Sequence, residues 1–362
     1  MSDRRDFIVV GGGIAGLATA LGLAKHGYRV SVYDQGRLED SATSRATGIL
    51  TFQMPPPFMD WAVETWRIYK GMLESEGGLW EAGALLFSKE KNCIDRIKRW
   101  FGSRNLDAYY VDVREAEIVA GVKINMGEGE YAMYTSEILV DVGQLLNTYH
   151  RLLSEYDVDV KYGADVKLIS DGVKVDGVSV KGEVIIAAGP WTPQLIPELK
   201  DKLIIYKCQV AHVKGVRLNV IIEDDILDYY ASPAGGNTIM LGDGSNARLN
   251  DPREGFKPDM WESVKLMEKL AKRIEGLDNI YPISVWSAPC VVGIDGFPVA
   301  GVVREGLYVI AGFNGVGISL APAVAERVVG LIRGVWKRFD MLDPHRDIKE
   351  VDIDLPEPYR FC

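Results

Sequence analysis

The first forty residues combine a short apolar run, a helical pattern and an alternating pattern. The apolar run Asp6 to Val10 predicts a strand, and the Ala- and Leu-rich segment Ile14 to His26 predicts a helix. Apolar and polar residues then alternate over Arg29 to Asp34, which predicts a second strand. Residues 6–34 are therefore expected to form a βαβ unit. The three prolines at 55–57 form a stiff break in the chain that follows this unit.

Later segments repeat these two patterns. Apolar positions recur every 3.6 residues from Asp141 to Tyr156 and again over 259–275, where Asp259 is the expected N-cap. Strands are expected at 158–162, 166–169, 173–175 and 184–188. Near the C-terminus we expect a strand at 307–311, a glycine-rich turn at 312–317 and a helix at 321–332.

Three glycines lie between the first predicted strand and helix. Gly11 permits a sharp turn, Gly13 lets the backbone approach a pyrophosphate, and Gly16 allows close helix–strand contact. The helix N-terminus attracts the anion. Asp34 follows Gly11 by 23 residues, where a carboxylate can accept hydrogen bonds from ribose hydroxyls. This combination predicts a dinucleotide site rather than a turn kept for packing, and it leaves NAD and FAD both open.

A second glycine-rich turn, Gly312 to Gly317, also separates a predicted strand from a helix. One dinucleotide needs only one pyrophosphate loop, so a second helix N-terminus suits a different anion. A reduced flavin carries such negative charge near N1 and its C2 carbonyl, which a helix dipole stabilises. An ordinary helix start is the alternative.

Composition narrows the class of protein. The net charge is −10 and no basic stripe is present, which argues against nucleic acid as a partner. Four scattered cysteines indicate neither a disulfide framework nor a metal site, and they predict a reducing, cytoplasmic compartment. The uncharged run 7–24 could be a signal peptide or membrane span, but its five glycines and the lack of a small-residue cleavage site favour the βαβ interpretation.

Over about residues 6–335, the chain resembles the FAD-dependent oxidoreductases related to D-amino-acid oxidase, glycine oxidase and monomeric sarcosine oxidase. The resemblance rests on the order and spacing of a series of motifs. The series is Gly11 to Gly16, Asp34, Ser44 to Gly48, Val140-Asp141, Gly163 to Val166, Ala187 to Trp191, Tyr230 to Pro233, Trp286, Asp295 to Pro298 and Gly312 to Pro322.

The resemblance implies an α/β fold in two interleaved domains. A Rossmann-like FAD-binding domain is expected from residues 1–79, 136–204 and 291–340. Residues 80–135 and 205–290, which are richer in aromatic and strand-forming residues, are expected to form a β-rich substrate domain with a mixed sheet and helices. Residues 341–362 are expected to be a C-terminal tail.

The resemblance also assigns cofactor-binding residues. Gly11, Gly13 and Gly16 would hold the pyrophosphate, and Asp34 the adenosine ribose. Ser44, Arg45 and Gly48 would lie near the flavin ring, Val166 near the adenine, and Ala188, Gly189 and Trp191 along the channel. Gly312, Asn314, Gly315, Val316 and Gly317 would face the pyrimidine end of the flavin. Ile14, Ala15, Gln35 and Thr47 complete the expected set.

The chain departs from the family pattern at three positions. Cys290 stands where amino-acid-oxidising relatives often carry an arginine that clamps the substrate carboxylate. Ala288 stands where sarcosine oxidases attach their flavin, so we expect non-covalent FAD. Met240 replaces a lysine that promotes reaction with oxygen, which slightly favours a dehydrogenase over an oxidase.

Tyr230 is the expected catalytic substrate contact, with Tyr229 or Tyr206 beside it, and core packing is the alternative for each. Arg45 and Arg248 are candidates to replace the arginine that binds the substrate carboxylate in relatives. Arg45 is preferred because it lies in the turn expected next to the flavin. The acidic run at 223–225 is expected to be a solvated loop.

We therefore expect an enzyme that oxidises the CH–NH bond of a small amine or amino acid, an N-alkyl or cyclic amino acid being favoured, to an imine that hydrolyses. The alternatives are a FAD-dependent 2-hydroxy-acid or glycerol-phosphate dehydrogenase and a non-catalytic flavin-holding subunit of a larger electron-transfer complex. The sequence leaves the electron acceptor open among oxygen, a quinone and a partner protein, and it is compatible with homo- or hetero-oligomers.

Overall fold

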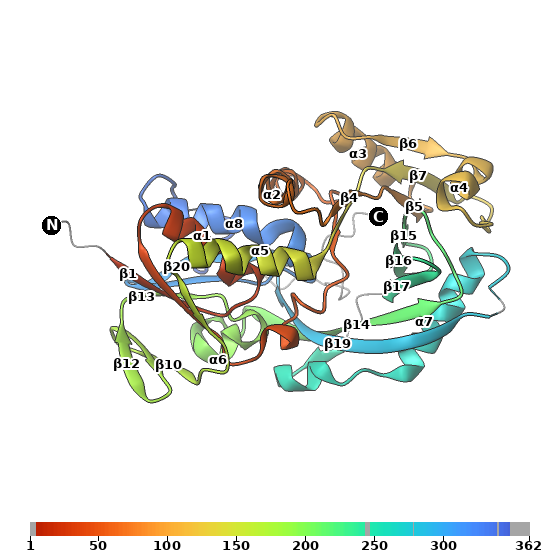
Figure 1. Cartoon of the computed structure of the whole chain (residues 1–362). Coiled ribbons are helices and arrows are strands. Elements are labelled where there is room, and N and C mark those ends of the chain that lie inside the picture. Colours follow the sequence, from red (N-terminus) through yellow and green to blue (C-terminus); the bar gives the residue numbers. More distant parts are fainter. Residues whose placement is uncertain (1–4, 243–246, 278, 339, 348–362) are drawn as a thin grey trace.

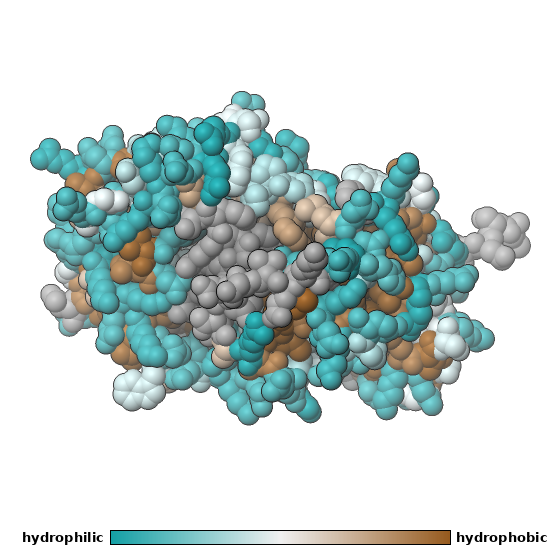
Figure 2. All heavy atoms as spheres, turned by 180° about the vertical axis from the view of Figure 1, so that it is seen from behind, coloured by the Kyte–Doolittle hydropathy of each residue, from teal (hydrophilic) through white to brown (hydrophobic). Residues whose placement is uncertain are grey.

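The computed structural model describes residues 5–242, 247–277, 279–338 and 340–347. Its helices and strands form two large sheets with separate groups of helices (Figure 1). Seen from the opposite side, the surface is mainly hydrophilic, and its apolar side chains lie in small separate groups (Figure 2). The expected tail at 341–362 lies outside the described residues from position 348 onward.

The first sheet has six strands in the order β20-β21-β13-β1-β2-β9. Its strands are β1 (Asp6–Val10), β2 (Arg29–Tyr33), β9 (Asp159–Lys161), β13 (Glu183–Ile186), β20 (Val299–Arg304) and β21 (Leu307–Ala311). All neighbours pair in parallel except β20 with β21. This is a Rossmann-like arrangement, and it confirms the predicted α/β class and the βαβ opening.

Both faces of this sheet are covered. The helices α1 (Ile14–Lys25), α5 (Val142–Glu155) and α8 (Gly317–Ile332) contribute to the apolar core on one face together with Val9 and Ile185. The small sheet β10 (Val166–Ile169), β11 (Gly172–Val175) and β12 (Val178–Lys181) packs with Ile8 and Val184 on the other. Burial on both faces explains why β1, β13 and β21 are continuous apolar runs rather than alternating ones.

The uncharged run at 7–24 is β1, the glycine loop and most of α1. In the described part of the chain, no helix is long and apolar enough to cross a membrane.

Helix α8 begins at Gly317, four residues before its predicted start at Ala321. The predicted start was therefore one turn too late. Pro322 lies inside the helix, where it cannot donate a hydrogen bond to the carbonyl of Ile318. Tyr69 on helix α2 (Phe58–Leu73) supplies the missing donor, since its hydroxyl lies 2.9 Å from that carbonyl oxygen. A contact 249 residues apart in sequence therefore satisfies the carbonyl group that the proline leaves open.

The second large sheet has nine strands and draws on residues 84–135 and 203–293. Its strands are β5 (Ala84–Ser88), β6 (Ala108–Val111), β7 (Tyr131–Thr135), β14 (Leu203–Lys214), β15 (Ile221–Asp224), β16 (Tyr229–Pro233), β17 (Thr238–Gly242), β18 (Arg248–Leu249) and β19 (Tyr281–Gly293). Helix α7 (Met260–Arg273), capped by Asp259 as predicted, shares an apolar core with this sheet.

Smaller elements complete the chain. They are β3 (Ile49–Leu50), β4 (Leu79–Glu81) and β8 (Ile138–Val140), which pair in a third sheet, and the helices α3 (Lys91–Gly102), α4 (Val113–Ala120) and α6 (Thr192–Leu195). Short 3₁₀ turns lie at Leu38–Asp40, Gly189–Trp191, Pro197–Leu199 and Pro252–Phe256.

The acidic run at 223–225 is not the predicted solvated loop. Glu223 and Asp224 belong to β15, and Asp224 is 1% exposed. The guanidinium of Arg273 on α7 lies 2.7 Å from Asp224 and 2.6 Å from Glu130, and it stacks on Phe87. A buried carboxylate is stable here because it is paired and hydrogen-bonded, and the sequence could not reveal a partner 49 residues away.

Candidate active site

The glycines of the first loop have different roles. A Cβ at Gly11 would lie 2.2 Å from the carbonyl oxygen of Ala187, and one at Gly16 would lie 1.9 Å from that of Gly11. A Cβ at Gly13 would meet only the hydroxyl of Thr43, at 3.2 Å. Gly11 and Gly16 are therefore required by backbone packing, whereas Gly13 leaves the backbone open toward the neighbouring cavity.

Asp34 directly follows β2 and lies beside this loop. Its carboxylate accepts hydrogen bonds from the backbone N–H of Gly12 at 2.6 Å and from that of Gly36 at 2.7 Å. The side chain thus fixes the loop, and it also lines the cavity where a ribose contact was predicted. Because each carboxylate oxygen has more than one acceptor site, ribose binding is compatible with these bonds.

Thr43 is a contact that the sequence reasoning missed. Its hydroxyl accepts a hydrogen bond from the N–H of Ile14, at the first residue of α1, over 3.1 Å. The donor belongs to the set of amides that a helix leaves unsatisfied at its N-terminus. A hydroxyl residue in the segment after β2 was the available signal, but only the fold places it 29 residues back at the loop.

A cavity of about 610 Å³ extends from the glycine loop to the second glycine-rich turn. Most of the predicted cofactor-binding residues line it: Gly11, Gly13, Ile14, Ala15, Asp34, Gln35, Val166, Ala188, Gly189, Trp191, Gly312, Asn314, Gly315 and Gly317. Trp191 stacks on Phe256, which also lines the cavity. The open backbone at Gly13 and the N-terminus of α1 fit the pyrophosphate of a dinucleotide.

The remaining predicted cofactor residues lie elsewhere. Thr47, Gly48 and Val316 line a second, adjoining cavity. Ser44 bonds to Ser41 within its own turn, and Gly16 packs against Gly11.

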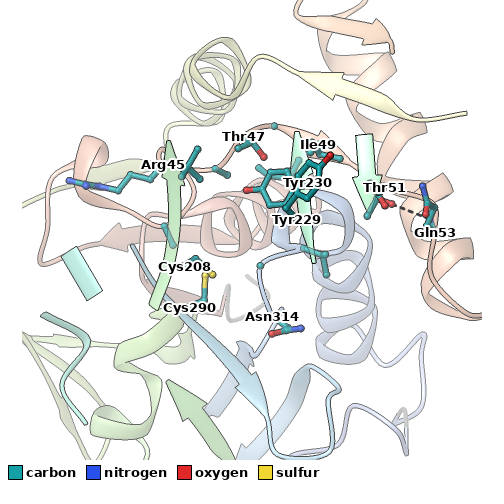
Figure 3. A pocket seen from close by; sticks show the side chains of 18 of the residues that line it. Arg45, Thr47, Ile49, Thr51, Gln53, Cys208, Tyr229, Tyr230, Cys290 and Asn314 are labelled. Atoms are coloured by element: carbon teal, nitrogen blue, oxygen red, sulfur yellow. Dashed lines mark hydrogen bonds between the residues drawn. The ribbon is translucent and has the colours of Figure 1, made fainter. Parts of the chain in front are cut away.

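The second cavity has a volume of about 250 Å³ and lies against the second sheet (Figure 3). It shares six lining residues with the first cavity: Ala42, Ala46, Cys290, Asn314, Gly315 and Ile318. Most of its sheet wall comes from alternate positions of neighbouring strands, namely Tyr206, Cys208 and Val210 of β14, Trp286, Ala288 and Cys290 of β19, Tyr230 of β16, Glu223 of β15 and Leu86 of β5. Asp224 and Tyr229, at intervening positions of β15 and β16, line it too. The two cavities therefore meet beside Cys290 and the turn before α8.

Tyr230 is placed in this cavity, as predicted, and it is the cross-strand neighbour of both Glu223 and Gly242. Its ring lies over Gly242, where a Cβ would come within 2.6 Å of the phenol oxygen. Gly242 thus makes the space that Tyr230 occupies, a role with no sequence signal of its own.

The two neighbouring tyrosines differ. Tyr206 is fully buried, and its hydroxyl donates a hydrogen bond to the side-chain oxygen of Asn314, which joins the second sheet to the turn before α8. Tyr229 is 2% exposed, and its hydroxyl has no hydrogen-bond partner among the described residues. Burial raises the pKa of Tyr229 well above its ordinary value, so this phenol stays protonated.

Arg45 lines the cavity, but its guanidinium is held on the side away from Tyr230 (Figure 3). It lies 3.1 Å from a carboxylate oxygen of Asp40 and 3.2 Å from the carbonyl oxygen of Ser287, and it stacks over Phe256. The structure therefore does not bring this guanidinium together with Tyr230. The other candidate, Arg248, is an exposed residue of β18 and does not line either cavity.

The cysteines are distributed differently from the expectation. Cys208 and Cys290 are reduced thiols at diagonal positions of β14 and β19, and both line the second cavity. Cys93 on α3 is disulfide-bonded, which the sequence pattern did not predict.

A ring system bound at the α8 end of the larger cavity would face the smaller one, which is the arrangement of a dinucleotide-dependent oxidoreductase. The match to known families agrees with this class. The family model described as FAD dependent oxidoreductase matches residues 6–331, and the chain belongs to that family. FAD is thus the dinucleotide, a choice that the glycine loop alone left open.

Individual relatives are distant. Glycine oxidase from Geobacillus kaustophilus is 24% identical, over 94% of this chain and 96% of the relative. The solved structure of that organism's glycine oxidase has a TM-score of 0.80 at 21% identity, covering 95% of this chain and all of the other. The structure of L-proline dehydrogenase from P. horikoshii has a TM-score of 0.82 at 22% identity, covering 95% and 98%. These structures show the shared fold.

Proposed function

We propose that the protein oxidises the CH–NH bond of a small amine or amino acid, giving an imine that hydrolyses. FAD, when bound in the larger cavity, supplies the hydride acceptor. The observation that carries the proposal is the shared wall of the two cavities beside Cys290 and Asn314, which would present a small molecule directly to the cofactor. Glycine oxidase and L-proline dehydrogenase, both similar to this chain, are named for amino-acid substrates.

Apolar residues of the smaller cavity, next to the wall that it shares with the larger one, favour a neutral amine there. An amine can give up a hydride from the adjacent carbon only when its nitrogen is neutral, and an apolar environment lowers the pKa of an ammonium group. Val210, Trp286, Ala288 and Ile318 provide such an environment next to the shared wall. Tyr230, whose phenol lies over Gly242 on the side toward β14, would orient the substrate by a hydrogen bond.

The finer assignments follow from three side chains. Ala288, at the position where sarcosine oxidases attach their flavin, has no nucleophile, which supports non-covalent FAD. Met240 carries no charge, which supports a dehydrogenase that passes electrons to an acceptor other than oxygen. A glycerol phosphate would require clustered Arg or Lys, and Arg45 is the only such residue among the described residues of the cavity wall.

The reaction can be tested by titrating the holoenzyme without air with sarcosine, L- and D-proline, glycine and lactate. Loss of the oxidised flavin spectrum with an amine supports the proposal, and loss with lactate alone contradicts it. Tyr230→Phe should slow flavin reduction about tenfold or more while FAD stays bound. If this variant loses FAD, Tyr230 does not have the substrate role.

A further inference from the structure

We propose that Tyr162, oriented by His150, prepares the first glycine loop for the pyrophosphate of FAD by fixing the peptide group that follows Gly12. Both side chains would act on the cofactor only through the backbone of the loop, so they are positioning residues. The inference goes beyond the proposed function, because it concerns how FAD is retained and holds whichever substrate the enzyme oxidises.

Tyr162 lies beside the loop because three parallel strands end together. β1, β2 and β9 are neighbours in the six-stranded sheet, and the glycine loop, Asp34 and Tyr162 follow their carboxyl ends. The pairing of Tyr33 with Lys161 aligns the last two strands, and the N–H of Asp34 lies 2.9 Å from the carbonyl oxygen of Lys161. The carboxyl ends of parallel strands are where such sheets bind ligands. The fold thus brings Tyr162 to a loop that lies 150 residues earlier in the chain.

The ring of Tyr162 packs directly on Gly12. A Cβ at Gly12 would come within 2.8 Å of the ring. Gly12 is not among the glycines with a positive φ, so its backbone conformation does not require a glycine. The phenol oxygen lies 3.3 Å from the carbonyl oxygen of Gly12. The roles of Gly11, Gly13 and Gly16 leave this fourth glycine unexplained, whereas the contact with Tyr162 accounts for it.

The hydrogen of the phenol has one direction that satisfies both of its contacts. Burial, and secondly the charge of Asp34, raise the pKa of Tyr162, so the hydroxyl stays protonated. Nε2 of His150 on α5 lies 2.9 Å from the phenol oxygen, and burial lowers the pKa of His150, so its ring is neutral. A carbonyl oxygen can only accept. Both bonds therefore form when Nε2–H of His150 donates to the phenol and the phenol donates to Gly12.

These contacts hold the Gly12 residue at both of its backbone groups. Asp34 accepts from its N–H at 2.6 Å, and Tyr162 donates to its carbonyl. In a trans peptide, the carbonyl of Gly12 and the N–H of Gly13 point in opposite directions. Of these two residues, only Gly13 lines the larger cavity in the described part of the chain. Tyr162 thus turns the carbonyl away from the cavity and leaves the N–H side of the peptide for an anion.

Four variants of the holoenzyme test this bond. Tyr162→Phe keeps the ring and removes the hydroxyl, His150→Leu removes the donor, and His150→Gln places an amide N–H near the position of Nε2. We expect Tyr162→Phe and His150→Leu each to speed FAD release about fivefold or more. His150→Gln and the control Tyr156→Phe, at an exposed tyrosine that follows α5, should stay within about twofold of the native rate. Release is measured from the fluorescence of flavin freed on dilution.

Two further measurements separate positioning from general damage to the fold. The double variant Tyr162→Phe/His150→Leu should release FAD no faster than the faster single variant, because both residues act through one bond. The ³¹P resonances of the bound FAD pyrophosphate should shift in Tyr162→Phe, while the visible absorption spectrum of the flavin ring stays unchanged.

Native release rates in Tyr162→Phe and His150→Leu, additive effects in the double variant, or loss of FAD from His150→Gln as fast as from His150→Leu would overturn the inference. Unchanged ³¹P resonances in Tyr162→Phe would overturn it as well. If Tyr162→Phe does not fold, the two His150 variants test the same bond, since only the leucine variant should release FAD faster.

Discussion

The phenol of Tyr230 occupies the space above Gly242 on the neighbouring strand, where even a methyl group would come within 2.6 Å of its oxygen. The position of the predicted substrate contact therefore depends on the absence of a side chain one strand away. Such a dependence connects the pairing of β16 and β17 directly to the cavity.

Gly242→Ala should displace the phenol of Tyr230 and slow flavin reduction at least as much as Tyr230→Phe, about tenfold or more, while FAD binding is unchanged. Reduction rates without air and the flavin content of the purified variant check this. Gly71→Ala, on helix α2 where a Cβ meets nothing within 4 Å, is the matched control and should react normally. Full activity in Gly242→Ala would show that the phenol does not act on the substrate.

Two glycines of the first loop should give opposite results. Gly13→Ala should weaken FAD binding about tenfold or more and leave the stability of the cofactor-free protein within about 0.5 kcal/mol, because the new Cβ projects toward the cavity and meets only Thr43. Gly16→Ala should destabilise the cofactor-free protein by about 1–3 kcal/mol, because its Cβ would collide with the Gly11 carbonyl. Fluorescence titration with FAD and denaturant unfolding measure the two effects. Loss of stability in Gly13→Ala would contradict the assignment.

Tyr69→Phe should destabilise the fold by about 1–3 kcal/mol, because the carbonyl of Ile318 would lose its donor and Pro322 cannot replace it. Denaturant unfolding of the holoenzyme measures the change. Tyr156→Phe, at a tyrosine that is 45% exposed, is the control and should change stability by less than about 0.5 kcal/mol. Equal stability of the two variants would mean that water or another group satisfies the carbonyl.

Glu137 predicts how stability depends on pH. Its folded pKa lies well above its ordinary value of 4.5, so the folded protein holds this proton more tightly than the unfolded chain. The resulting stabilisation is complete below about pH 4.5 and is lost as the pH rises through the folded pKa. Glu137→Gln should remove this loss, so its stability relative to the native protein should be greater at about pH 8 than at about pH 5. A pH-independent difference would mean that Glu137 does not titrate differently on folding.

Local patterns allowed the nucleotide-binding half to be predicted from the sequence. The βαβ opening, the two glycine-rich turns and the cap at Asp259 all depend on residues close together in the chain. The first turn of α8 was missed, and the hydroxyl that bonds its Ile318 carbonyl comes from Tyr69, which is distant in sequence.

The second cavity was predicted less completely for the same physical reason. Tyr230 could be found from its motif, whereas Glu223 was read as part of a loop. Its neighbours in the sheet, Leu86 and Tyr230, come from separate segments, and only strand pairing decides which face a side chain occupies. The domain boundaries, the electron acceptor and the clamp role of Arg45 stay predictions.

Because six residues line both cavities, binding in one cavity affects the free energy of binding in the other. With the cofactor in place, its ring would form part of the floor on which a small molecule rests, so the two occupancies are coupled. By reciprocity, whatever factor FAD adds to the affinity for an unreactive amine, that amine must add to the retention of FAD.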